Sequence, residues 1–167
     1  MRPPLPMLLL CLLAGCATTP QASTDTVFLV VRHAEKATGA GEDPMLSEAG
    51  RSRAQSLASL LGDAPLRAVY ATPTHRARDT ARPTAQRRGL QVREYDAARP
   101  PSETATLLHM RHAGQQVLMV GHSDTVPVLV SSLCACPVAP LDEGAYGDLY
   151  EIRIGADGHA TLLRRRF

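Results

Sequence analysis

Arginine and histidine side chains that could bind and transfer a phosphate follow three apolar segments of the chain. Arg32 and His33 come directly after the apolar run 27–31, and Arg76 and His122 follow two further runs. Arginine binds phosphate through forked, charge-assisted hydrogen bonds. A neutral histidine nitrogen can attack phosphorus to give a phosphohistidine, and a second histidine can stabilise charge on the transferred group. These residue types predict phosphoryl-transfer chemistry, provided that the fold brings them together.

The segments that precede these residues must therefore form neighbouring strands. Predicted strands cover residues 27–31, 67–71, 91–95, 116–120, 148–154 and 159–165, and predicted helices cover residues 47–61, 74–88, 102–112 and 125–133. This alternation predicts an α/β fold, with a mostly parallel sheet between two layers of helices. In such sheets the ligand site lies beyond the carboxyl ends of the strands. The candidate residues stand at those ends.

Local signals refine the boundaries of these elements. Ser47 and Ser102 are candidate N-caps for the first and third helices. Pro83 predicts a kink or a break in the second helix, because proline lacks the backbone N–H. The segment 155–158 contains two glycines and predicts a hairpin turn between the last two strands.

Four stretches of the chain resemble the motifs of the histidine phosphatase superfamily, which has the phosphoglycerate mutase-like fold. Residues 29–36 (LVVRHAEK) resemble its defining motif, and residues 71–81 (ATPTHRARDTA) resemble its S-P-x-x-R-A-x-x-T-A segment, with Thr72 in place of the serine. Residues 44–54 resemble the start of its first helix, and residues 120–123 (VGHS) resemble the strand end that carries its second histidine. The resemblance covers about residues 26–166, in the family's order.

The resemblance implies a role for each of these residues. His33 is the phosphorylated nucleophile, Arg32 and Arg76 bind the phosphate, and His122 completes the pocket. The implied chemistry needs neither a metal nor a cofactor. His75, His109, His112 and His159 do not match the functional positions of the motifs, so we expect them on the surface.

The proton donor to the leaving group is the least determined part of the predicted site. Members of the family often use a glutamate after the third strand, within a longer motif that is not found here. Glu94 and Asp96 occupy the similar place, and Asp124 follows His122 by two residues. Asp124 departs from the asparagine often found in relatives with a similar stretch, and it could instead cap the following helix. Substrate or water could also supply the proton, although we favour Asp124.

The first residues resemble a bacterial lipoprotein signal. The apolar run 5–13 is too short to span a bilayer, and residues 13–16 (LAGC) resemble a lipobox, in which Cys16 carries the lipid after cleavage. The expected organisation is a signal peptide at 1–15, a lipidated Cys16 with a tether to residue 25, and one domain at 26–167. Ala17 resembles the sorting residue of outer-membrane lipoproteins. An ordinary secretory signal and an uncleaved anchor are the alternatives.

Composition argues against a nucleic-acid-binding protein. The 167 residues carry 18 Lys+Arg against 16 Asp+Glu, and a net charge of +2 is too small to indicate a nucleic-acid partner.

Cys134 and Cys136 are separated by a single residue, and in an exported protein they could form a labile disulfide or remain buried thiols. We leave that choice open.

The leading interpretation is a metal-independent phosphomonoester hydrolase that acts through a phosphohistidine and is lipid-anchored on the periplasmic face of a membrane, with the outer membrane favoured. Its partner would be a phosphorylated small molecule, whose identity the sequence does not give. Residues 100–101 and the loop 137–147 are the expected rims of the pocket. The alternative function is a non-catalytic envelope lipoprotein of the same fold that binds phosphate or another anion.

Overall fold

The computed structural model of the protein describes residues 25–39 and 41–167. The predicted signal peptide, Cys16 and the tether up to residue 24 lie outside the described residues. The strands are β1 (Thr26–Arg32), β2 (Leu66–Ala71), β3 (Val92–Glu94), β4 (Gln116–Gly121), β5 (Asp148–Ile154) and β6 (Ala160–Arg166). The helices are α1 (Glu48–Leu61), α2 (His75–Arg87), α3 (Pro101–Arg111) and α4 (Thr125–Cys134).

The strands form a six-stranded sheet in the order β3-β2-β4-β1-β5-β6. Strand β4 pairs in parallel with β1 and β2, and β2 pairs in parallel with β3, whereas β5 is antiparallel to both β1 and β6. Every residue of β1 is buried, as its continuous apolar run predicts for a strand covered on both faces. The predicted mostly parallel sheet is confirmed.

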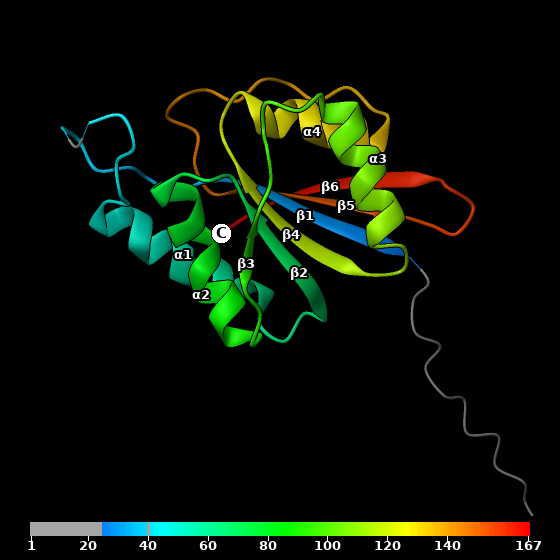
Figure 1. Ribbon diagram of the computed structural model, residues 1–167, viewed down its shortest axis with the longest axis horizontal. Coiled ribbons are helices and arrows are strands. Elements are labelled where there is room, and N and C mark those ends of the chain that lie inside the picture. Colours follow the sequence, from blue (N-terminus) through cyan, green and yellow to red (C-terminus); the bar gives the residue numbers. More distant parts are fainter. Residues whose placement is uncertain (1–24, 40) are drawn as a thin grey trace, which may run out of the picture.

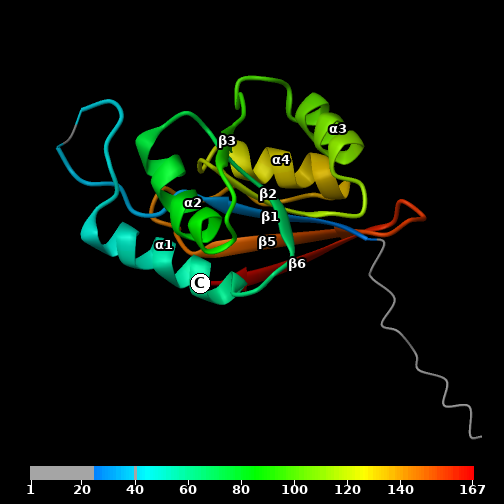
Figure 2. The ribbon, with the colours of Figure 1, turned by 60° about the horizontal axis from the view of Figure 1, so that its bottom comes forward.

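Two helices cover each face of the sheet, as Figures 1 and 2 show. Apolar residues of α1 and α2 pack with Leu29, Val69 and Leu118 on one face. Apolar residues of α3 and α4 pack with Phe28 and Met119 on the other. The sheet therefore separates two apolar layers, which confirms the predicted α/β/α arrangement. Among the described residues, no helix is long and apolar enough to cross a membrane.

The helix ends agree with the predicted signals at α1 and differ at α3. Ser47 caps α1, because its hydroxyl accepts a hydrogen bond from the Gly50 N–H at 3.1 Å. The prediction of Ser102 as a cap is wrong. Helix α3 starts at Pro101, whose fixed φ suits the first helical position, and Pro100 precedes it without a side-chain cap. Of the kink or break predicted at Pro83, the break is wrong, since α2 continues to Arg87 with its apolar side packed in the core.

Helix α1 begins in close contact with the segment that follows β1. Its cap residue Ser47 donates a backbone hydrogen bond to the Glu35 carbonyl at 2.9 Å. A Cβ atom on Gly50 would collide with that same carbonyl oxygen and lie 3.0 Å from its carbon. Glycine at position 50 thus lets the helix hold the backbone two residues after His33.

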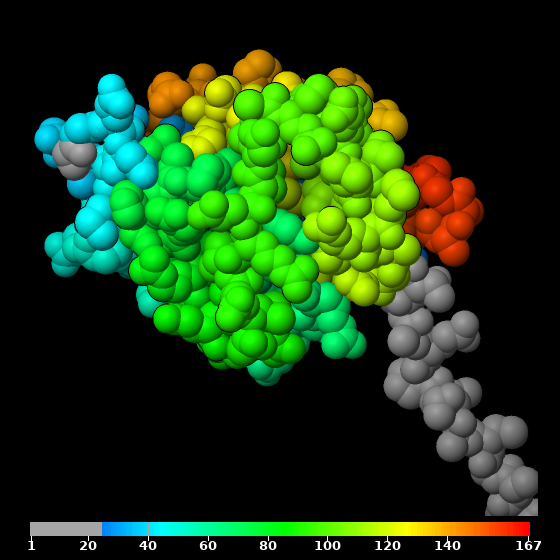
Figure 3. Space-filling view, in the orientation of Figure 1, coloured from blue at the N-terminus to red at the C-terminus, as the bar shows by residue number. Residues whose placement is uncertain are grey.

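The carboxyl ends of β1, β2 and β4 meet at one end of the molecule. Arg32 pairs with Gly121, and Ala71 pairs with Val120. In the space-filling view the loop after β1, in cyan, projects at this end, and the β5–β6 turn, in red, lies at the opposite end (Figure 3). The candidate residues from three strand ends are therefore neighbours in space.

Candidate active site

A polar pocket of about 400 Å³ lies beyond the carboxyl ends of β1 and β4. The parallel register places the two candidate histidines side by side: the His33 N–H donates to the Gly121 carbonyl at 2.9 Å, and the His33 and His122 rings lie 5.2 Å apart. The pocket is lined by Arg32, His33, Lys36, Arg76, His122, Ser123, Asp124 and Glu143. The structure thus brings together all five of the favoured site residues.

His33 is oriented so that one ring nitrogen faces the pocket. Its Nδ1 lies 2.7 Å from the Ala34 carbonyl oxygen, and its Nε2 lies 3.2 Å from Nε of Arg76. A carbonyl oxygen can only accept, so Nδ1 carries the proton, and Nε2 accepts the hydrogen bond from Arg76. This tautomer leaves the lone pair on Nε2, which makes Nε2 the atom that can attack phosphorus.

Burial keeps the His33 ring uncharged. The His33 side chain is only 4% exposed, and burial, together with the positive charges of Arg76 and Arg32, lowers its pKa from 6.5 to about 4. Burial and the nearby Arg76 also lower the pKa of His122. Its Nε2 lies 2.7 Å from the Thr72 hydroxyl, which fixes the ring beside His33. Both imidazoles are therefore neutral near neutral pH.

We expect the His33 imidazole to titrate at a pH of about 4 rather than near 6.5. The lowered pKa means that the neutral ring persists as the pH falls from 6.5, until protonation overcomes the cost of a buried charge. Imidazole NMR as a function of pH measures this directly, with His33 assigned by its loss in the His33→Ala variant. A His33 pKa close to 6.5 contradicts the electrostatic account.

The two arginines of the pocket have different surroundings. Arg76 bonds to His33 through Nε and lies 3.3 Å from the Asp43 carboxylate through Nη1. Arg32 donates through Nη1 to the carbonyls of residues 142, 143 and 145 at 2.8 to 3.0 Å, and through Nη2 to the Glu143 carboxylate at 3.2 Å. Arg32 thus holds the loop that follows α4, and only its Nη2 is directed to the pocket. The sequence led us to expect that both Nη atoms would be available to a phosphate.

The three candidate proton donors are in different places. Glu94 lies 2.8 Å from Arg78, and Asp96 accepts from the Ala98 N–H at 2.8 Å. Neither of these two carboxylates lines the pocket, whereas Asp124 does. Asp124 precedes α4 but makes no capping hydrogen bond with its side chain. Geometry therefore favours Asp124 over the other two and does not support a capping role for it.

Glu143 is a pocket residue that the sequence did not single out. It lies in the loop between α4 and β5, and its carboxylate accepts from the Ser123 hydroxyl at 2.7 Å as well as from Arg32. The only signal for it was its place in a long loop expected to form a rim. Its proximity to Ser123 depends on Arg32 binding the carbonyls of that loop, which no local pattern reveals.

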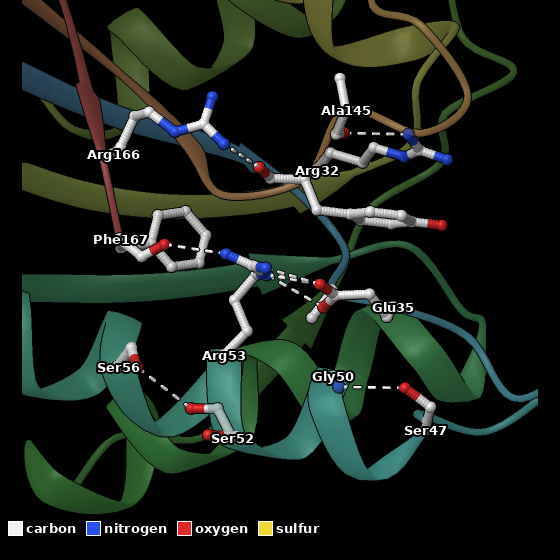
Figure 4. A network of polar contacts seen from close by, with 12 residues as sticks. Arg32, Glu35, Ser47, Gly50, Ser52, Arg53, Ser56, Ala145, Arg166 and Phe167 are labelled. Carbon is white, nitrogen blue, oxygen red and sulfur yellow. Dashed lines mark hydrogen bonds and ion pairs between the residues drawn. The ribbon is translucent and has the colours of Figure 1, made fainter.

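Arg53 on α1 connects the segment after His33 to the end of the last strand (Figure 4). Its guanidinium donates to both carboxylate oxygens of Glu35, at 2.6 to 2.9 Å, and to the Phe167 carbonyl at 3.0 Å. Gly147 has a φ of +86°, and a Cβ atom there would lie 2.6 Å from Arg53 Nη1. Because Glu35 follows His33 by two residues, Arg53 is in a place to position the backbone next to His33.

We expect Arg53→Met to lower kcat about tenfold and to leave KM nearly unchanged, because a small misplacement of a reacting group slows chemistry more than binding. Methionine keeps the apolar stem and removes the pairing with Glu35. Steady-state kinetics give the split, and Arg67→Met, at an exposed position of β2, is the matched control. An unchanged kcat in Arg53→Met rules out the positioning role.

His112 corrects one prediction from the sequence. It is buried, at 4% exposure, and its ring bonds to the Tyr70 hydroxyl at 3.0 Å and to Gln115 at 2.9 Å. His112 is thus a satisfied structural histidine and not a surface residue, while His75 and His159 are exposed as expected.

Cys134 and Cys136 form a disulfide, so one of the two open alternatives is confirmed. The disulfide lies at the end of α4, away from the residues that line the pocket. Among the described residues, no group of three or more histidine, cysteine or carboxylate side chains is arranged to hold a metal ion.

Comparison with known proteins finds a family profile that matches part of the chain. The sequence profile of the histidine phosphatase superfamily (branch 1) matches residues 28–99, which include Arg32, His33 and Arg76. A comparison with curated proteins by sequence found no match.

Several solved structures share the fold. The protein histidine phosphatase SixA complexed with tungstate is 18% identical, covers 84% of this chain and 96% of its own, and has a TM-score of 0.67. A mycobacterial glucosyl-3-phosphoglycerate phosphatase complexed with VO3 is 18% identical, with coverages of 84% and 98% and a TM-score of 0.64. A phosphoserine phosphatase of Entamoeba histolytica complexed with 3-phosphoglyceric acid is 16% identical, with coverages of 82% and 94% and a TM-score of 0.63. Residues 28–99 thus match the histidine phosphatase superfamily, and the chain shares the fold of these solved phosphatases.

Proposed function

We propose that the chain hydrolyses phosphomonoesters through a covalent phosphohistidine on Nε2 of His33. The observation that carries the proposal is the neutral, buried His33, with Nε2 turned into a pocket that contains Arg76 and His122. Two of the solved structures named above are complexed with tungstate or VO3, oxyanions that resemble a phosphoryl group. A pocket of the same fold with two arginines suits such a group.

The first step transfers the phosphoryl group to the enzyme. Nε2 of His33 uses its lone pair to form a bond to phosphorus as the bond from phosphorus to the ester oxygen breaks. Arg76, Nη2 of Arg32 and His122 stabilise the charge on the transferred oxygens. The departing oxygen takes a proton from the carboxyl group of Asp124, which gives the alcohol and leaves a carboxylate.

The second step returns the enzyme to its starting state. Water attacks phosphorus and the phosphorus–nitrogen bond breaks, so Nε2 regains its lone pair. The Asp124 carboxylate takes the proton that the water loses, and inorganic phosphate leaves. No step requires a metal ion or a cofactor.

Assay of residues 17–167 with an aryl phosphate in the presence of EDTA tests the proposal. We expect turnover that chelation does not change, because His33 supplies the nucleophile itself. Absence of turnover at any pH by a folded protein would instead favour the alternative of a phosphate- or anion-binding protein without catalysis. Loss of activity with EDTA would contradict the metal-independent mechanism.

We also propose that the protein is anchored by a lipid on Cys16 and faces the periplasm, favouring the outer membrane. The support is the short apolar run followed by Leu-Ala-Gly-Cys at 13–16. A lipid group attached to the protein adds membrane-binding free energy in proportion to the length of acyl chain that it buries in the bilayer. Radiolabelled palmitate should enter the wild-type protein and not Cys16→Ser, and membrane fractionation should place the wild type with outer membranes. Labelling that survives Cys16→Ser rules out this anchor.

A further inference from the structure

The charges around the phosphate pocket leave an excess of one positive charge before any substrate enters. The pocket cations are Arg32, Lys36 and Arg76, and the carboxylates are Glu143 in the lining and Asp43 in contact with Arg76. Asp124, the proposed proton donor, enters the first step as a neutral carboxyl group. Both histidines are neutral. A dianionic phosphate therefore gives the occupied pocket an excess of negative charge. This excess repels a negative charge on the leaving group and attracts a positive one.

Glu143 lies where it would meet the leaving group. Its backbone carbonyl is held by Arg32 at 2.8 Å, and its carboxylate is held by the Ser123 hydroxyl at 2.7 Å. Its side chain is nevertheless 79% exposed, at the open side of the pocket. These contacts keep the carboxylate at the mouth, facing the part of the substrate beyond the phosphate.

The Glu143 carboxylate is also ionised. The hydrogen bond from Ser123, and then the charge of Arg32, lower its pKa below the usual range. A phosphoryl oxygen that binds Nη2 of Arg32 replaces only the bond at 3.2 Å between that nitrogen and Glu143. The bonds from Ser123 and to the backbone do not involve this nitrogen, so the negative charge stays beside the bound phosphate.

We propose that this site selects phosphomonoesters whose leaving group carries no negative charge and favours those with a cationic ammonium group, and that Glu143 sets this selectivity. The inference rests on the proposed phosphatase function and adds the class of substrate. Like charges at the mouth repel a carboxylate on the leaving group, and opposite charges attract an ammonium group. The selectivity is electrostatic, so dissolved salt weakens it.

Phosphoethanolamine and O-phosphoserine form a matched pair for the test, because both carry an ammonium group and phosphoserine adds one carboxylate. We expect kcat/KM of the wild type to be about tenfold higher for phosphoethanolamine, as two charges several ångströms apart near a protein surface predict. Glu143→Gln should reduce that ratio to about twofold. Glu103→Gln, on the exposed side of α3, should keep the wild-type ratio.

The outcomes separate this inference from the function on which it rests. If p-nitrophenyl phosphate is not hydrolysed, the proposed function fails. If it is hydrolysed and Glu143→Gln keeps the wild-type ratio, the selectivity assigned to Glu143 is wrong. The wild-type protein gives a second measurement in case the variant does not fold: its ratio should fall towards one as salt rises, and a ratio independent of salt contradicts the inference.

Discussion

Replacing His33 with alanine should lower kcat by about 10⁴- to 10⁶-fold, the loss typical when an enzyme loses its nucleophile. Alanine removes Nε2, so no phosphorus–nitrogen bond can form. Arg76 and His122 remain and still bind phosphate, which leaves only weak residual catalysis. Single-turnover assays with an aryl phosphate measure the loss, and a bound-phosphate titration should show that the pocket survives.

The matched control for this variant is His159→Ala. His159 is an exposed histidine in the turn between β5 and β6, at the opposite end of the molecule from the pocket. We expect full activity for His159→Ala and an unfolding temperature close to the wild-type value for both variants. Retention of wild-type turnover by a folded His33→Ala protein would be incompatible with the phosphohistidine mechanism.

Replacing Arg76 with alanine should lower kcat/KM by about 10³-fold, because arginines that stabilise a transferring phosphoryl group contribute effects of at least this size. The variant loses a cation at the phosphate and also the hydrogen bond from Nε to His33 Nε2 at 3.2 Å. It leaves Asp43 at the site without the cation that it contacts at 3.3 Å, which adds repulsion against the incoming phosphate. Steady-state kinetics over a wide substrate range measure the effect.

Arg82→Ala is the control on the same helix. Arg82 is exposed and pairs with Asp79 at 2.7 Å, so its loss should change kcat/KM by less than about twofold, as is usual for exposed ion pairs. Arg76→Lys should recover little activity, since an ammonium group lacks the planar fork. Equal activity of Arg76→Ala and Arg82→Ala would show that Arg76 is not part of the phosphate site.

The strand ends show why much of the site was predictable. The apolar run of β1 specifies a strand buried on both faces, and parallel strands place their carboxyl ends together. Once the register sets Arg32 beside Gly121, His33 and His122 must be neighbours. The order of strands and helices therefore predicted this part of the pocket from local patterns alone.

Contacts between distant segments were not predictable in the same way. Nη1 of Arg32 binds three carbonyls more than a hundred residues later in the chain, and that contact brings Glu143 to the pocket. His112 is buried because Tyr70 and Gln115 satisfy both of its ring nitrogens. Helical spacing alone gave no sign of either partner. Residues in loops, and polar residues on a packed helix, depend on tertiary contacts that leave no periodic signal.

Trapping the phosphorylated enzyme tests the central claim most directly. Radiolabelled substrate is mixed with the wild-type protein, the reaction is stopped in alkali, where phosphohistidine is stable, and the labelled peptide is mapped. The account predicts one label on Nε2 of His33, absent from His33→Ala and discharged by water in the native enzyme. A label on another residue would contradict the account. So would the absence of labelled enzyme under conditions in which hydrolysis of the intermediate limits the rate of turnover.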